Sequence, residues 1–271
     1  MLSSLFAFSC SSYWQKILVE FIRVSMPCCQ MIINLRPNMD PNSISIDFEQ
    51  AAFQSIEQLF PNTLLDGCFF HFAKNFFKHL KSNQLLDRYN NDQMFALEAR
   101  MIPAMAFVPI NDLDMVFAAL TNFLPIEFAP LLQWLENSYL GRPVGPAGPN
   151  IQQQQQPQRR APLIPVAMWN VHNRVIAHIG RTNNYAEASH RQVQLELQTM
   201  HPTTWKLIDD LQKVQKSRDQ YHESLVAGHP PKKKLQKHIN CDNNILRIVR
   251  NYANTQPLDY LRGIAHNFML H

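Results

Sequence analysis

Two carboxylates of the chain stand where they could share a divalent metal ion. Asp47 directly follows Ser43–Ile46, whose alternation of polar and apolar residues predicts a β-strand. Glu187 falls in the first turns of a helix that we expect to begin at Thr182 or Asn183, two good N-cap residues. Mg²⁺ prefers carboxylate oxygens, and metal-dependent nucleases use distant acids to hold two ions about 3.5 to 4 Å apart on a phosphodiester. Asp47 and Glu187 are therefore candidate catalytic and metal-binding residues, and an ordinary surface position is the alternative for each.

Cys68 and His71 have the Cys-x-x-His spacing of half a zinc site. A structural zinc ion needs four ligands, and no second pair with this spacing follows. The fold would have to bring further ligands from elsewhere in the chain, such as His172, His178, His238 and Cys241. We therefore expect a buried cysteine and a structural or DNA-facing histidine, and we do not expect zinc as a cofactor.

Three polar residues before Glu187 are candidates for DNA binding. Arg181, Asn183 and Asn184 lie at the expected helix start, where backbone N–H groups and side-chain amides can hold a phosphate. Helix capping explains the two asparagines equally well, so both interpretations stay open.

A lysine cluster follows two prolines in the last fifth of the chain. It comprises Lys232, Lys233 and Lys234, with Lys237 close behind. Nuclear import receptors and phosphates both bind such patches, and a solvated run of charge is the alternative. Because helix-breaking prolines keep the cluster accessible, we favour binding to an import receptor and expect a nuclear protein.

The elements that must position these residues form a β-α-β-α series. Residues 48–60 carry apolar side chains at helical spacing and should cover one face of the sheet. Residues 64–70 are predicted to be a second strand, after which His71 opens another helix. Two strands joined through a helix imply a parallel pair, and the chemistry of parallel sheets collects at the carboxyl ends of the strands. Asp47 and His71 both belong to that edge, and the expected fold class is α/β.

Helices are expected in most of the remaining chain. Residues 76–140 show helical patterns interrupted by prolines, which indicates a large all-helical insertion. Residues 141–165 contain Pro, Gly and a run of five glutamines, which is typical of a flexible or disordered loop. A helix that ends near residue 225 is expected to bury four residues at helical spacing: Trp205, Ile208, Leu211 and either Val214 or Gln215.

The composition sets limits on the class of protein. With 271 residues, 46% of them hydrophobic, the chain can build one large core or two small ones. A net charge of +4 gives no general basicity, and five cysteines form no disulfide framework. No span approaches the roughly 20 apolar residues that a membrane helix needs, so we expect no membrane association. The expected organisation is a helical or irregular lead-in at 1–42, a central domain at 43–225, and a basic break with closing helices at 226–271.

Taken together, three segments resemble the Mutator-like element (MULE) transposase domain in their order and intervals. They are Ile46-Asp47-Phe48-Glu49-x-Ala51-Ala52, Gly67-Cys68-Phe69-Phe70-His71-Phe72-x-x-Asn75 and Arg181-Thr182-Asn183-Asn184-x-x-Glu187-x-x-His190. The resemblance implies an RNase H-like fold with a helical insertion and DDE-type DNA strand cleavage and transfer. It also implies Asp47 as the second acid of the triad, Glu187 as the third, Mg²⁺ or Mn²⁺ as cofactor, and DNA and other transposase chains as partners.

The chain departs from the family at the first acid of the triad. In the family this acid lies on the first strand of the sheet, well before the position of Asp47, whereas the only aspartate upstream here is Asp40. Asp40 precedes Pro41, and the residue before a proline favours an extended turn. We therefore expect an incomplete RNase H-like sheet in a transposase-derived protein with absent or badly impaired cleavage. The alternative is a nuclear DNA-binding or protein-interaction module without catalysis.

Overall fold

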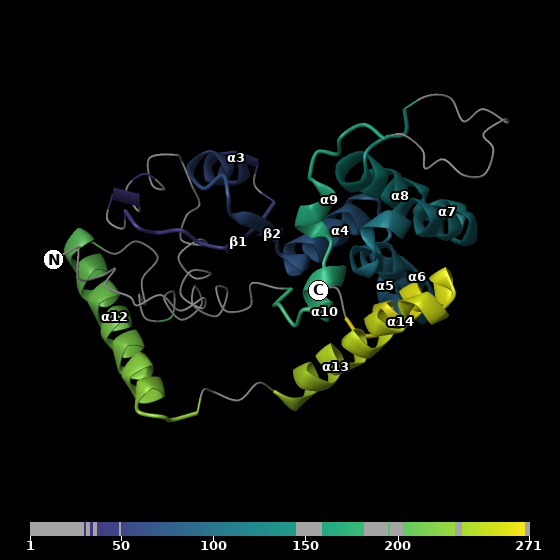
Figure 1. The fold of residues 1–271 in the computed structure, drawn as a ribbon. Coiled ribbons are helices and arrows are strands. Elements are labelled where there is room, and N and C mark those ends of the chain that lie inside the picture. The colour runs from purple at the N-terminus through teal and green to yellow at the C-terminus, as the bar shows by residue number, and fades with distance from the viewer. Residues whose placement is uncertain are drawn as a thin grey trace. The chain divides into compact units, whose positions relative to one another are not determined.

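The computed structural model describes residues 30, 33–34, 37–48, 50–144, 159–181, 195, 203–230 and 235–268. Helices dominate these residues, and strands β1 and β2 form a two-stranded parallel sheet (Figure 1). The chain divides into two compact units. The first comprises Met1–Ser45, Gln50–Leu64 and Asn183–Leu235, and the second comprises Ile46–Glu49, Leu65–Thr182 and Gln236–His271.

The sheet confirms the predicted parallel pairing. β1 spans Ser43–Ile46, as expected from its alternating sequence, and β2 spans Leu64–Gly67. The backbone N–H of Leu64 donates to the carbonyl of Asn42, and that of Cys68 donates to the carbonyl of Ile46, each at 3.1 Å. Both bonds have the same offset in sequence, which is the even spacing of a parallel ladder. Helix α3, Gln50–Leu59, makes the crossover between the strands.

The second strand is shorter than predicted. β2 ends at Gly67, Cys68 is the N-cap, and helix α4 runs over Phe69–Ser82. Phe69, Phe72 and Phe76 are buried at helical spacing, so the apolar run after β2 is the inner face of a helix. The prediction that His71 opens this helix at a strand end is wrong, since His71 is the third residue of α4.

The second unit is an assembly of short helices. Its remaining α-helices are α5 Leu86–Asn91, α6 Gln93–Ala104, α7 Leu113–Phe123, α8 Ala129–Leu135, α9 Val166–Trp169, α10 His172–Ile176, α13 Gln236–Arg250 and α14 Pro257–Ala265. Single turns of 3₁₀-helix are η2 Met105–Phe107, η3 Ile110–Asp112, η4 Ile126–Phe128 and η6 Tyr252–Asn254, and a π-helical turn, η5, covers Glu136–Leu140.

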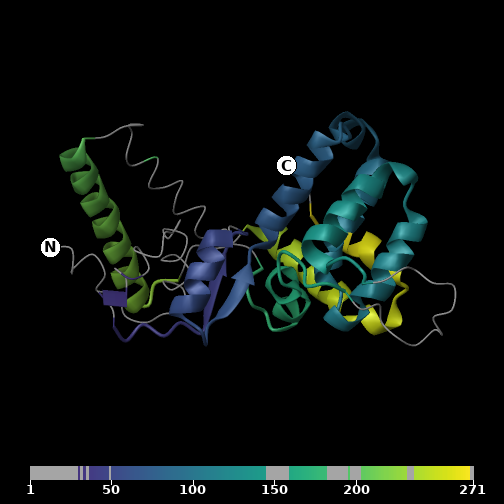
Figure 2. The same cartoon turned by 90° about the horizontal axis from the view of Figure 1, so that it is seen from above.

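The core of this unit joins segments that lie far apart in sequence. Helix α14 packs along α6 (Figure 2), and the hydroxyl of Tyr260 donates to the carbonyl of Phe107 at 2.5 Å. The ring of Phe72 stacks on Trp169 and meets Tyr139 edge to face, with centroids 5.4 and 4.8 Å apart. Ile245 of α13 is also fully buried in this core. The closing helices 236–268 are therefore part of the same packed body as the helices of residues 69–140.

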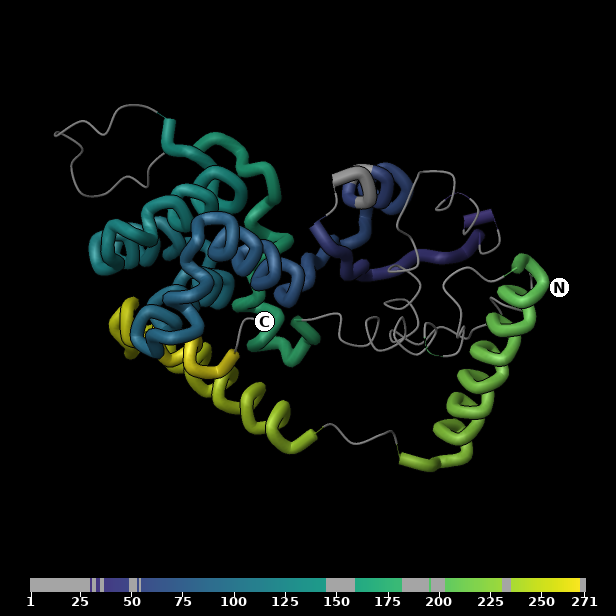
Figure 3. Tube along the Cα trace, turned by 180° about the vertical axis from the view of Figure 1, so that it is seen from behind, coloured from purple at the N-terminus to yellow at the C-terminus, as the bar shows by residue number. Residues whose placement is uncertain are grey.

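Helix α12, Thr204–Val226, is the longest helix among the described residues of the first unit (Figure 3). The side chain of Thr203 caps it by accepting the backbone N–H of Lys206 at 3.3 Å. The predicted buried face is wrong, because Trp205 is 80% exposed and Ile208 is 40% exposed. Of the residues expected inside, Val214 alone is buried. The inner stripe of α12 is rotated from the predicted one and also contains Asp210, which is 1% exposed.

None of the helices in the described part of the chain combines the length and the apolar character that a bilayer crossing demands.

Candidate functional site

The carboxyl edge of the sheet carries the predicted acid Asp47, which directly follows β1 and is partly exposed. The next residue, Phe48, packs its ring edge to face on Tyr139 with centroids 5.9 Å apart. Gly67 at the end of β2 makes room for this ring, since a Cβ atom there would lie 2.5 Å from Cε1 of Phe48. The backbone on either side of Asp47 is thus fixed by β1 before it and by a packed aromatic ring after it.

A buried arginine, Arg174, contacts the end of β2 at the same edge of the sheet. Its Nη1 donates to the carbonyl of Gly67 at 2.8 Å, and its Nη2 donates to the carbonyl of Gly180 at 2.5 Å. Its Nε lies 3.8 Å from Oδ1 of Asp66. Burial lowers the pKa of the Arg174 guanidinium, while Asp66 and then Cys68 act in the opposite direction. Because an arginine stays protonated in proteins, Arg174 is a fixed buried cation that ties the end of β2 to the segment before residue 181.

Arg181 is anchored through both its backbone and its side chain. Its carbonyl accepts the backbone N–H of Phe69 at 2.9 Å, and its Nη2 lies 2.8 Å from Oδ1 of Asp242 in α13. The guanidinium also lies over the ring of Phe107, with its carbon 5.9 Å from the centroid. A DNA phosphate, the ligand predicted for Arg181, would have to compete with Asp242 for this guanidinium.

These contacts bring residue 181 to the edge that carries Asp47. Ile46, the residue before Asp47, accepts a hydrogen bond from Cys68, and the next residue, Phe69, donates one to Arg181. Five other residues predicted for the site lie outside the described part of the chain: Asn183, Asn184, Lys232, Lys233 and Lys234. The same holds for Glu187, the predicted third acid.

Cys68 and His71 lie on successive parts of the turn from β2 into α4. The thiol of Cys68 is fully buried, and the side chain of His71 is partly buried. Two of the other candidate zinc ligands have protein partners: the Sγ of Cys241 donates to the carbonyl of Asn267, and the Nδ1 of His172 lies 2.7 Å from the carbonyl of Phe107. Within the residues that the structure describes, no three His, Cys, Asp or Glu side chains are grouped to hold a metal ion.

Arg174, Asp66 and Asp242 are the positioning residues that sequence reasoning missed. Arg174 carries no clear signal in the sequence, because it directly follows the polar residues His172 and Asn173. Its carbonyl partners belong to residues up to 107 positions away, so they could not be found without the fold.

Comparison of the chain with protein-family models, with curated proteins and with solved structures gives no match.

Proposed function

We propose that the chain is a transposase-derived nuclear protein that binds DNA and holds a divalent metal ion between Asp47 and Glu187, with DDE-type strand cleavage absent or badly impaired. One observation carries the proposal. The hydrogen bonds from Cys68 to Ile46 and from Phe69 to Arg181 hold the segment that leads to Glu187 beside the strand end that carries Asp47. The order of motifs that resembles the MULE transposase domain, with its RNase H-like fold, supports the same assignment.

Glu187 is only six residues beyond Arg181 in the sequence. A shared Mg²⁺ ion would take oxygen atoms of both carboxylates as ligands at about 2.0 to 2.1 Å. A bound Mg²⁺ or Mn²⁺ would supply Lewis acidity toward a phosphoryl oxygen and lower the pKa of a bound water.

Impaired cleavage follows from the lack of a suitable first acid of the triad. Asp40 is the one aspartate that precedes Asp47 in the chain, and it is exposed in the segment before β1. The four residues of β1 alone extend over about 13 Å at about 3.3 Å per residue, and Pro41 and Asn42 also stand between the two acids. Two catalytic metal ions lie only about 3.5 to 4 Å apart, so Asp40 cannot complete the pair of sites with Asp47.

A combined binding and nicking assay tests this function. The full chain is incubated with supercoiled plasmid at low salt in Mg²⁺ or Mn²⁺, alongside Asp47→Asn, Glu187→Gln and the matched control Asp40→Asn. We expect a gel shift for all four proteins and no nicking above background. Efficient metal-dependent nicking that Asp47→Asn abolishes would contradict the impairment, and the absence of any gel shift would contradict DNA binding.

A second function, a nuclear DNA-binding or protein-interaction module without metal chemistry, is favoured by Arg247 and Arg250, two basic residues in the last turn of α13. This alternative predicts that neither Mn²⁺ nor Asp47→Asn alters any property of the protein, including its thermal stability.

A further inference from the structure

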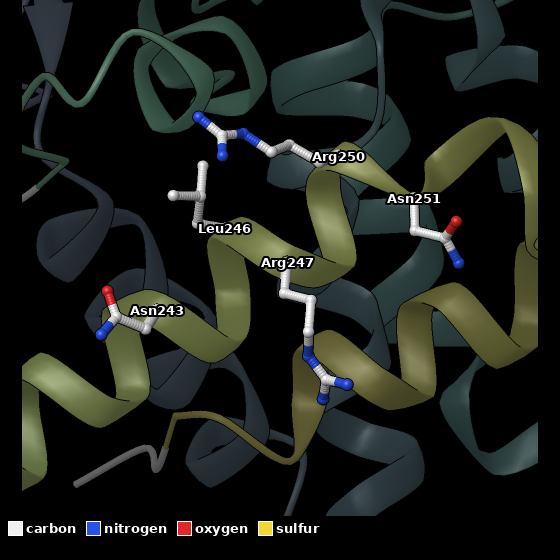
Figure 4. A pocket seen from close by; sticks show the side chains of 5 residues that line it. All are labelled: Asn243, Leu246, Arg247, Arg250 and Asn251. Atoms are coloured by element: carbon white, nitrogen blue, oxygen red, sulfur yellow. The ribbon is translucent and has the colours of Figure 1, made fainter.

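Helix α13 carries a polar hollow on its outer face. Five side chains line the hollow, which has a volume of about 380 Å³: Asn243, Leu246, Arg247, Arg250 and Asn251 (Figure 4). Leu246 is the one apolar residue among them, and no acid is present. Pockets for small molecules are lined mostly by apolar and aromatic side chains, so this lining suits a polar, anionic partner better.

The two arginines of the hollow keep their charge free for a ligand. The Nη2 of Arg250 lies 3.3 Å from the Nε2 of His178, which must accept this hydrogen bond because a guanidinium only donates. Asp242, the acid of α13, is paired with Arg181. Among the described residues, neither Arg247 nor Arg250 forms an ion pair with a carboxylate. Other arginines of the same unit do form one: Arg88, Arg159, Arg174, Arg181 and Arg262.

The spacing of these side chains matches a phosphate backbone. Asn243, Arg247 and Asn251 are four residues apart, so they lie along one side of the helix and span about 12 Å at 1.5 Å per residue. Three to four nucleotides of one DNA strand cover that length at about 3.4 Å each. Arginine and asparagine side chains both contact phosphates, and a guanidinium can bind one through two parallel hydrogen bonds.

We propose that this face of α13 binds the phosphodiester backbone of double-stranded DNA without reading its sequence. The inference rests on the proposed function only in taking DNA as the partner. The hollow starts at Asn243, next to the Asp242 that anchors Arg181, so the DNA-binding face and the segment leading to Glu187 are held by the same helix.

The test compares two double variants that remove the same charge. Arg247→Gln with Arg250→Gln changes the proposed surface. Arg142→Gln with Arg160→Gln is the matched control, because both of these arginines are exposed in the same unit and lie outside the hollow. Fluorescence anisotropy measures binding of each full-length protein to a labelled 20-base-pair duplex between 50 and 200 mM NaCl, and circular dichroism confirms that each variant is folded.

Each phosphate contact contributes a slope of about −0.9 in log K against log salt, which corresponds to about eightfold in affinity at 0.1 M. The α13 variant should therefore bind roughly 60-fold more weakly than the wild type and lose about 1.8 from the slope, while the control stays within a few-fold of the wild type. The single variants Arg247→Gln and Arg250→Gln should each show about half of this slope change.

Equal losses in the two double variants, or unchanged binding by the α13 variant, would overturn the proposal. So would displacement of DNA by poly-glutamate at matched charge concentration, which would assign the face to an acidic peptide. The metal site has its own readout, the change in thermal stability with Mn²⁺, so a failure of the metal site and a failure of the α13 surface are separate results.

Discussion

Replacing Arg174 by methionine keeps the length of this buried side chain and removes its charge and its donors. The carbonyls of Gly67 and Gly180 then lose hydrogen bonds of 2.8 and 2.5 Å, and Asp66 loses the cation 3.8 Å from its carboxylate. Breaking a buried charged pair on one side costs about 3 to 5 kcal/mol, and hydrogen bonds from charged donors contribute about 1.5 to 3 kcal/mol each. We expect the free energy of unfolding to fall by about 3 to 5 kcal/mol.

The matched control is Arg88→Gln, which removes an exposed ion pair with Glu127. Such surface pairs contribute about 0 to 1 kcal/mol. Urea denaturation followed by the fluorescence of Trp134 and Trp169 reports on the second unit, where both tryptophans lie. At an m value of about 2 kcal/mol/M, the urea midpoint of the Arg174 variant should fall by about 2 M. If the free energies of unfolding of the two variants lie within about 1 kcal/mol of each other, the contacts of Arg174 do not stabilise the fold as described above.

Three further predictions concern stability. Gly67→Ala should destabilise the protein by at least about 1 to 3 kcal/mol in urea denaturation, because its Cβ would overlap the ring of Phe48 at 2.5 Å. Asp92→Ala should cost about 1 kcal/mol in the same assay, since the Asp92 carboxylate accepts two N–H groups at the start of α6, at 3.0 and 3.1 Å; an unchanged midpoint would contradict this. Burial raises the pKa of Tyr139 to about 12, although a hydrogen bond with Asn75 opposes the shift. The stability that the neutral phenol contributes is fully present below its ordinary pKa near 10 and is lost between about pH 10 and 12, and Tyr139→Phe should reduce this loss in a pH series of urea titrations.

The sequence predicted the local framework of the site where one pattern was unambiguous. The alternation in Ser43–Ile46 gave β1 its observed bounds, and the helix that follows gave the parallel crossover. The run Cys68-Phe69-Phe70 was predicted to belong to the second strand. Its pattern could not decide this, because a short apolar run fits a strand or a helix equally well. In the structure, Phe69 and Phe72 are buried in the helical core as part of α4, and His71 lies within the same helix.

Properties set by tertiary packing could not be predicted. The helical period over α12 was right, but its phase toward the interior depends on what the helix covers, and Trp205 proved to be exposed. The function of Arg174 depends on carbonyl groups that only the fold brings within reach. Likewise, no local pattern shows that Asp242 pairs with Arg181.

The most direct test of the central claim is the thermal unfolding of the full chain with and without Mn²⁺. A metal that binds only the folded protein stabilises it by about 2.7 kcal/mol at 100 times its Kd, which should raise Tm by about 5 to 10 °C. We predict this shift for the wild type and for Asp40→Asn, and its loss in Asp47→Asn and in Glu187→Gln. A wild-type Tm that does not change with Mn²⁺, or an Mn²⁺-dependent rise in Tm that persists in Asp47→Asn, would contradict a metal site shared by Asp47 and Glu187.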